Sequence, residues 1–365
     1  MDKMALPEEW EILRSWLPED LAHRAKETGF MRRARGLQDA ECWLRLILMH
    51  VAGGLSLQQT AIRARELGLA SISGVALFKR LRSAEKWLVN LTGHFLSEHA
   101  RIFGRAVDTN LPYRMRLIDA TDIQEPGDTG TSLRVHYSLR LPELTCDHYE
   151  LTDDHGGEKL GRFQFQPGEL ILADRGYSHR AGVAAVLSAK AEVLFRWNPN
   201  CFPVEDAAGQ PFNLLRGLRG LRPKEVGHWS VHFQFENQRY DLRLCARRKS
   251  RVKAERARKK VIRKSARNQR KPPEETTLEL ADYVLVLTSI PEANISAAQA
   301  LELYRLRWQI ELAFKRLKSL LSFGHVPKSS DQSAKAWMQA KILTSLMIER
   351  VVLCGRFFPP WGYDG

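Results

Sequence analysis

The sequence has no pair of cysteines at metal-binding or redox spacing, because its five cysteines are scattered and no C-x-x-C motif occurs. Neither a disulfide framework nor a zinc site is therefore expected. No stretch approaches about 18 uninterrupted apolar residues, the length of a membrane-spanning helix. The N-terminal segment is acidic and lacks the apolar stretch of a signal peptide. We therefore expect a cytosolic protein without a membrane partner.

What the chain does have is length, apolar residues and positive charge. With 365 residues, 44% of them hydrophobic, it can bury a sizeable core and form two or more subdomains. The formal net charge is +14, and the segment 247–271 carries +13 of it, with fourteen Lys/Arg against one acid. A run this dense is either a solvated arm or a contact for a polyanion. The chemistry below favours DNA phosphates.

Residues 1 to about 105 carry helix-period apolar patterns and few strand-like alternations. Within them, the pattern predicts a helix from Ser56 to Leu67 that stops at Gly68, followed by a second helix capped by Ser71 or Ser73. The second helix carries the cations Lys79, Arg80, Arg82 and Lys86. This is the layout of a helix-turn-helix, whose second helix could enter the major groove. Any short helical hairpin with a glycine between its helices has the same pattern, so both interpretations stand.

From about Arg114 the pattern changes to strands. The run MRLIDATDI is an apolar strand that closes on Asp119, and the segments 134–141 and 147–153 alternate as antiparallel partners. A second apolar strand ends at Asp174, and a helix and a strand follow over 181–197. The order predicts a mixed sheet with helices packed on it. The segment 198–282 departs from this pattern: it offers a hairpin around Glu236-Asn237-Gln238, then the basic run, and reads as an inserted subdomain.

The segment LELYRLRWQIELAFKRLKSLL predicts a helix, beginning near Ser296, with an unusual polar stripe. At about 100° per residue, Tyr304, Arg307, Glu311 and Lys318 fall within about 60° of one another. Beside them runs an apolar stripe, formed by Leu303, Leu306, Ile310, Phe314, Leu317 and Leu321, that would be buried. The plain alternative is a solvated helix with Arg307–Glu311 as an ordinary ion pair.

Two aspartates complete a possible metal site. Asp119 and Asp174 each end an apolar strand, and ligands of α/β sheets bind at that edge. Together with Glu311 they would form an oxygen-only site, which suits Mg²⁺, and two such ions can catalyse an in-line phosphoryl displacement. Alone, each aspartate could be a turn or helix-cap residue, and Asp122 competes with Asp119.

The chain resembles a DDE transposase of a bacterial insertion sequence, in the group with the Tyr-x2-Arg-x3-Glu-x6-Lys signature. Tyr304, Arg307, Glu311 and Lys318 match that spacing without a gap, LIDAT matches the first aspartate segment, and LADRGY matches the second. The separations of 55 and 137 residues between the three acids fit the family. The resemblance covers about residues 50 to 345. It implies an α/β fold: a ribonuclease-H-like mixed sheet with flanking helices, interrupted by a mostly β insertion, plus an all-α N-terminal region.

The resemblance also implies residue roles and partners. Asp119, Asp174 and Glu311 would bind two Mg²⁺ ions, for which Mn²⁺ can substitute. Arg307 and Lys318 would hold DNA phosphates, and Tyr304 would donate a hydrogen bond to one. The family's insertion can carry a Trp that stacks a flipped base; Trp229 and Trp197 are the candidates, and core packing is the alternative for each.

Such enzymes nick the ends of their element with water and join the freed 3′ ends to target DNA, often through a hairpin. The expected partners are double-stranded DNA, at terminal inverted repeats and target sites, and a second copy of the chain, with no small-molecule substrate. The expected location is the bacterial cytoplasm, at the nucleoid. Only 47 residues follow Lys318, which leaves little room for a long C-terminal dimerisation helix. We therefore expect truncation or a dimer built elsewhere.

The expected domains follow from these assignments. They are a helical DNA-binding region at 1–108, the first part of the catalytic core at 109–197, the insertion at 198–282, and the rest of the core at 283–365. Two other functions stay open: a catalytically inactive DNA-binding regulator of the element, and a metal-dependent nuclease that cuts without joining.

Overall fold

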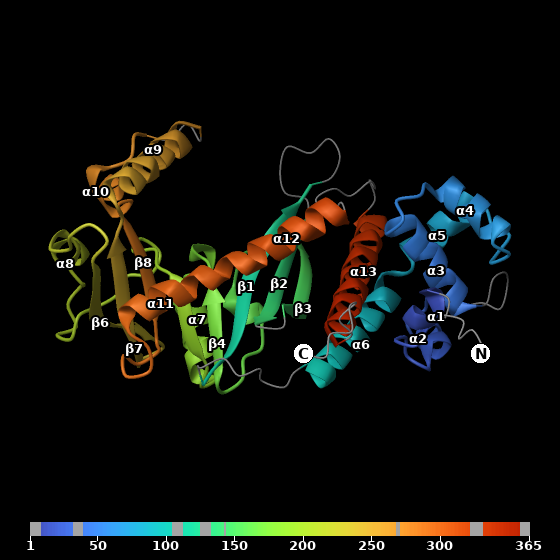
Figure 1. The fold of residues 1–365 in the computed structure, drawn as a ribbon, viewed down its shortest axis with the longest axis horizontal. Coiled ribbons are helices and arrows are strands. Elements are labelled where there is room, and N and C mark those ends of the chain that lie inside the picture. Colours follow the sequence, from blue (N-terminus) through green and yellow to red (C-terminus); the bar gives the residue numbers. More distant parts are fainter. Residues whose placement is uncertain are drawn as a thin grey trace, which may run out of the picture.

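An eight-stranded mixed sheet runs through the middle of the molecule (Figure 1). The computed structural model describes residues 9–31, 39–103, 112–124, 133–141, 144–267, 271–321 and 331–357. The strand order is β3-β2-β1-β4-β5-β8-β7-β6. The strands are β1 (Arg114–Ile123), β2 (Leu133–Leu141), β3 (Thr145–Asp153), β4 (Glu169–Ala173), β5 (Glu192–Arg196), β6 (Val226–Phe235), β7 (Gln238–Arg248) and β8 (Tyr283–Thr288).

The first five strands have the ribonuclease-H-like arrangement. Strands β1, β2 and β3 form an antiparallel meander. Strand β4 pairs parallel to β1, and β5 pairs parallel to β4, with the helix α7 (Arg180–Ser188) as the crossover between them. Helices flank this sheet, and six helices precede it in the described part of the chain. The predicted fold class is therefore confirmed.

The strands of the predicted insertion extend the same sheet. Strand β8 pairs antiparallel with β5, and β7 then pairs with β8 and with β6. The β6–β7 hairpin turns at Glu236 and Asn237, which both have positive φ angles, of 49° and 61°. Two such residues form the type I′ turn that matches the twist of a hairpin. The predicted hairpin is confirmed, and its strands lie at the far end of the sheet from the N-terminal helices (Figure 1).

Each face of the sheet buries its own core, because successive strand residues point to opposite faces. Leu117 and Leu172 belong to a core shared with the N-terminal helices and the C-terminal helices. Ile118 and Ile171 belong to a second core, shared with α7 and with the β6–β7 hairpin. All five residues of β4 are buried, as expected for a central strand covered on both sides.

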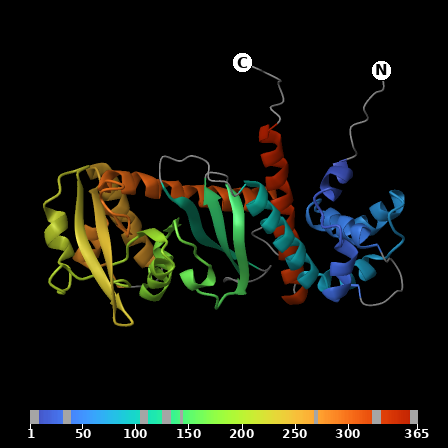
Figure 2. The same ribbon diagram turned by 90° about the horizontal axis from the view of Figure 1, so that it is seen from below.

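The predicted polar-stripe helix is a rod of three parts. Helix α11 (Ala297–Tyr304) is followed by a 3-10 turn, η3 (Arg305–Arg307), and by α12 (Trp308–Leu320). Ser296 begins the rod with a capping box, as its sequence position predicts. The rod crosses the sheet, with α11 against β7 and α12 against β1 (Figures 1 and 2). Its 3-10 turn falls between Tyr304 and Trp308, within the predicted stripe.

The predicted helix-turn-helix region consists of two capped helices. Ser56 forms a capping box, Gly68 ends the first helix with a φ of +66°, and Ser73 caps the second. The helices of this region are α1 (Glu9–Arg14), α2 (Leu21–Glu27), α3 (Ala40–Val51), α4 (Leu57–Glu66), α5 (Gly74–Arg82) and α6 (Glu85–Phe103). The helical hairpin is thereby confirmed, and its groove-reading role stays a prediction.

A long helix, α13 (Asp331–Phe357), joins the N-terminal helices to the sheet. It packs along α6 and also contacts α3, α5 and β3 (Figure 1). Its 27 residues show that the chain does contain a long C-terminal helix, which lies against its own N-terminal region. The Pro-rich end at 358–365 lies outside the described residues. No described helix is long and apolar enough to span a membrane.

The remaining elements are short, apart from one. They are α8 (Leu214–Arg219), α9 (Arg251–Arg267), α10 (Glu275–Leu280) and the 3-10 turns η1 (Leu160–Arg162) and η2 (Arg175–Tyr177). Helix α9 has 17 residues and contains most of the predicted basic run. It projects away from the sheet beside β8 (Figure 1).

Candidate active site

The register of the central strands brings Asp119 and Asp174 together. In the parallel pairing of β1 with β4, the last matched residues are Ile118 and Ala173, and the next residue of each chain segment is an aspartate. Asp119 shares its sheet face with Leu117, on the side covered by the α11–α12 rod. Strand β1 does not close on Asp119 as predicted. It continues to Ile123 because β2 still pairs with it after β4 has ended.

The guanidinium group of Arg307 links all three predicted carboxylates. Its Nη1 lies 3.2 Å from Oδ2 of Asp119, and its Nε lies 4.0 Å from Oδ1 of Asp174. Its Nη2 donates a hydrogen bond to Oε1 of Glu311, one turn further along the rod. The i,i+4 ion pair of the plain interpretation is therefore present, but as one part of a four-residue cluster.

Tyr304 joins the same cluster. Its hydroxyl donates to Oδ1 of Asp174 at 3.4 Å, and the guanidinium carbon of Arg307 lies 6.0 Å from the centre of its ring. Lys318 is exposed and lies seven residues after Glu311 on α12, a rise of about 10 Å along the helix axis. Three of the four signature residues therefore meet at the aspartates, and Lys318 extends the same rod beyond them.

Burial dominates the electrostatics of the cluster. It raises the pKa of Asp119 to about 7, against the opposing effects of the Ala120 N–H group and of Arg307. The negative charges of Asp174 and Glu158 raise this pKa further. Burial also raises the pKa of Tyr304. A carboxyl group whose pKa is raised to near neutrality by burial, beside other charged groups, is typical of a functional site.

The carboxylates fit a metal site only after a rearrangement. Among the residues that the structure describes, no three His, Cys, Asp or Glu side chains are grouped closely enough to hold a metal ion. Instead, Arg307 lies among the three acids. A cation thus already bridges an all-oxygen donor set, the set that Mg²⁺ prefers. With the guanidinium displaced, the donor set would suit a divalent ion.

A fourth carboxylate near the site was missed by the sequence reasoning. A Cβ on Gly176 would lie 1.6 Å from Oε2 of Glu158, so the glycine leaves room for that carboxyl group beside η2. The only signal in the sequence was the glycine two residues after Asp174. Asp122, the competing candidate, forms an ion pair with Arg134 at 2.7 Å and lies on the opposite face of β1 from Asp119.

The two tryptophans proposed for base stacking are both packed. Trp197 is 5% exposed and donates its indole N–H to the carbonyl of Phe202 at 2.7 Å. Trp229 is half-buried, with Phe212 at 6.1 Å between ring centres and its indole close to Gly217. These contacts agree with the core-packing alternative. Base stacking stays a prediction for both residues.

A ribonuclease-H-like sheet with three convergent carboxylates is the arrangement of the DDE transposases. Residues 152–347 match the family described as "Transposase DDE domain", a segment that contains Asp174 and Glu311 and begins after Asp119. The chain belongs to this family, and it is a transposase of a bacterial insertion sequence.

The chain is similar to transposases of several named elements. It is 34% identical over 349 residues to the putative transposase InsL of insertion sequence element IS186A from Escherichia coli K12, covering 94% of this chain and 93% of the relative. It is 34% identical over 350 residues to the transposase of IS421 from Escherichia coli, with the same two coverages. The transposase of IS231F from Bacillus thuringiensis subsp. israelensis is 27% identical over 263 residues, covering 63% of this chain and 54% of that protein.

One solved structure is a distant match. The piggyBac transposase synaptic complex with hairpin DNA aligns with a TM-score of 0.47 and 10% identity, covering 97% of this chain and 82% of that chain.

Proposed function

We propose that the chain binds the ends of its insertion sequence, cleaves them by metal-dependent hydrolysis, and joins the 3′ ends to target DNA by transesterification. The convergence of Asp119, Asp174 and Glu311 on one guanidinium group carries this proposal. Asp119 of β1, Asp174 just after β4 and Glu311 of α12 are far apart in the chain, yet they meet around one cation. Their meeting is expected where charge must be balanced during phosphoryl transfer.

In this proposal the three acids hold the divalent metal, Mg²⁺ or Mn²⁺. When bound, such ions activate a water or a 3′-hydroxyl and stabilise the leaving oxygen. Arg307, released from the carboxylates, donates its planar fork to a phosphate at the cleaved end. Lys318 reaches a phosphate further along the strand as a point charge, and the hydroxyl of Tyr304 donates to a phosphate of the same strand.

End recognition is assigned to the α4–α5 hairpin. In α5 and at the start of α6, Lys79, Arg82 and Lys86 are exposed, and Nη2 of Arg82 also donates to Oε1 of Gln332 at 3.2 Å. Arg80 is already occupied, because it donates to the carbonyl of Phe30 at 2.7 Å. The exposed cations would place α5 in the major groove, and two copies of the chain would bind the paired ends.

The test is cleavage of DNA that carries the sequence flanking the protein's own gene, with Mg²⁺, by wild type, Asp119→Asn and Asp122→Asn. Both variants replace an aspartate of β1 by its amide, but on opposite faces of the strand. We expect cleavage at defined ends by wild type and by Asp122→Asn, and none by Asp119→Asn. Binding without cleavage by wild type would favour the inactive regulator. Cleavage without joined product would favour the nuclease.

A further inference from the structure

A pocket of about 500 Å³ opens beside Asp174, one of the three acids of the proposed active site. Asp174 forms part of its wall, and so do five cations against that single acid: Arg175, Arg196, Lys249, Lys260 and Lys264. We call this the α9 pocket, because Lys260 and Lys264 come from α9. A concave site lined by one sign of charge concentrates ligands of the opposite sign.

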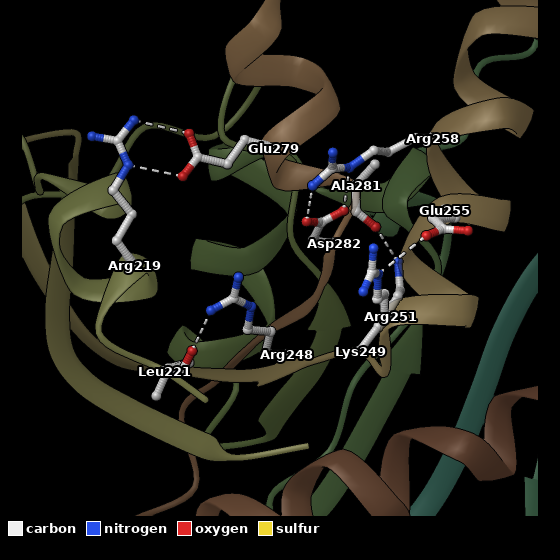
Figure 3. Close-up of polar contacts among 10 residues, drawn as sticks. All are labelled: Arg219, Leu221, Arg248, Lys249, Arg251, Glu255, Arg258, Glu279, Ala281 and Asp282. Carbon is white, nitrogen blue, oxygen red and sulfur yellow. Dashed lines mark hydrogen bonds and ion pairs between the residues drawn. The ribbon is translucent and has the colours of Figure 1, made fainter. Parts of the chain in front are cut away.

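Helix α9 is fixed to the body of the protein by its own ion pair. Arg258 donates to both carboxylate oxygens of Asp282, with Nε at 2.7 Å from Oδ1, and the Asp282 side chain is only 7% exposed (Figure 3). The ammonium group of Lys249, just before the helix, donates to the carbonyl of Ala281 (Figure 3). Helix α9 is therefore held in place against the body of the protein, although most of its residues are exposed.

One side of α9 faces the pocket. Its lining residues are Ala257, Lys260, Val261 and Lys264, the i, i+3, i+4, i+7 spacing of a single helix face. The exposed cations Lys259 and Arg263 are absent from the lining. The helix thus divides its positive charge between an inner face beside Asp174 and an outer face toward solvent.

The cations of the pocket are spaced to bind several consecutive negative charges rather than a single anion. Arg175 directly follows Asp174, and its Nη2 donates to Oδ1 of Asn198 at 2.7 Å, which holds it at the pocket wall. Lys260 and Lys264 stand about 6 Å apart along the helix axis on the same wall. Burial and the charge of Arg196 lower the pKa of Lys249, so an anion in the pocket would relieve repulsion among cations.

We propose that the α9 pocket binds the phosphodiester backbone of the DNA strand that passes Asp174, and that Lys260 and Lys264 position this strand for cleavage. This inference rests on the proposed function and adds a specific strand-positioning surface to it. It assigns different roles to neighbouring lysines of one helix. A general polyanion contact would make no such distinction.

The test compares Lys260→Ala/Lys264→Ala with Lys259→Ala/Arg263→Ala. Both double variants remove two positive charges from exposed positions of α9, and alanine preserves helix propensity. The measurement is the single-turnover cleavage rate of end DNA at saturating protein. We expect the inner-face pair to lose at least about tenfold, corresponding to one charged hydrogen bond, and the outer-face pair to lose less than about twofold.

Equal losses in both pairs, or no loss in either, would overturn the proposal. A second measurement separates it from failure of the proposed function: phosphate ethylation interference on end DNA, with both pairs placed in the Asp119→Asn background. Even if wild type does not cleave, the result can support binding of the DNA backbone in the α9 pocket. It does so if interference beside the element's end is lost only in the inner-face pair. An unchanged pattern in that pair would refute the proposal.

Discussion

Replacing Glu349 with Gln should stabilise the protein at alkaline pH and leave it unchanged at acid pH. Glu349 of α13 accepts hydrogen bonds from the hydroxyl of Tyr137 at 3.1 Å and from the backbone N–H of Cys146 at 3.2 Å. Burial raises the pKa of its carboxyl group from 4.5 to about 7, and the two hydrogen bonds oppose that shift. A Gln side chain carries no charge and resembles the protonated acid: its oxygen can accept from the Cys146 N–H, and its NH₂ group can donate to the Tyr137 hydroxyl.

The sign follows from linkage. Because the folded pKa of Glu349 is raised, the folded state favours the protonated acid. The contribution of this carboxyl group to the free energy of unfolding is fully present below pH 4.5 and is lost as pH rises through about 7. A shift of this size corresponds to about 3 kcal/mol, of which about 2 to 3 kcal/mol is lost between pH 5 and pH 8. The unfolding free energy of Glu349→Gln minus that of wild type should therefore grow by this amount over that range.

The assay is urea denaturation of both proteins at pH 5 and pH 8, with the m-value checked for constancy. Glu66→Gln is the matched control, because Glu66 is an exposed glutamate of α4 that forms a surface ion pair with Arg63. Its difference from wild type should not vary with pH. If the Glu349→Gln difference is also constant between the two pH values, the carboxyl group is not held in its protonated form and the reasoning fails.

Two further changes test the catalytic cluster. Arg307→Lys should slow DNA cleavage about 10²-fold while the protein stays folded, since one ammonium group cannot replace a fork that bridges three carboxylates and, once released, would bind a phosphate. Near-normal cleavage by this variant would show that the guanidinium group does not have the proposed role. Gly176→Ala should slow cleavage about tenfold, because its Cβ would collide with Glu158 beside Asp174. The control is Gly161→Ala, because a Cβ added at Gly161 meets no atom within 4 Å. If both variants slow cleavage equally, the collision with Glu158 is not the cause.

Local signals predicted the elements but not their assembly. The Ser296 cap, the apolar strand before Asp174 and the β6–β7 hairpin were readable because caps, apolar runs and turn residues act within a few positions. The pairing of the hairpin with β8 could not be predicted, since no local sequence pattern in either strand specifies a partner more than 30 residues away. The same holds for Glu158, whose proximity to Asp119 depends on how β3 and η1 are joined.

The structure also changes the interpretation of the four signature residues as a group. Spacing alone suggested one stripe of four residues presented to a metal and to phosphates. The structure instead shows Arg307 neutralising the acids from within the cluster. The guanidinium cannot donate the same N–H groups to carboxylates and to a phosphate at once. Under the proposed function, DNA binding and metal binding are therefore linked. A DNA phosphate that attracts Arg307 frees the carboxylate oxygens for metal ions. Metal ions that displace Arg307 from the carboxylates in turn raise the affinity of the protein for DNA.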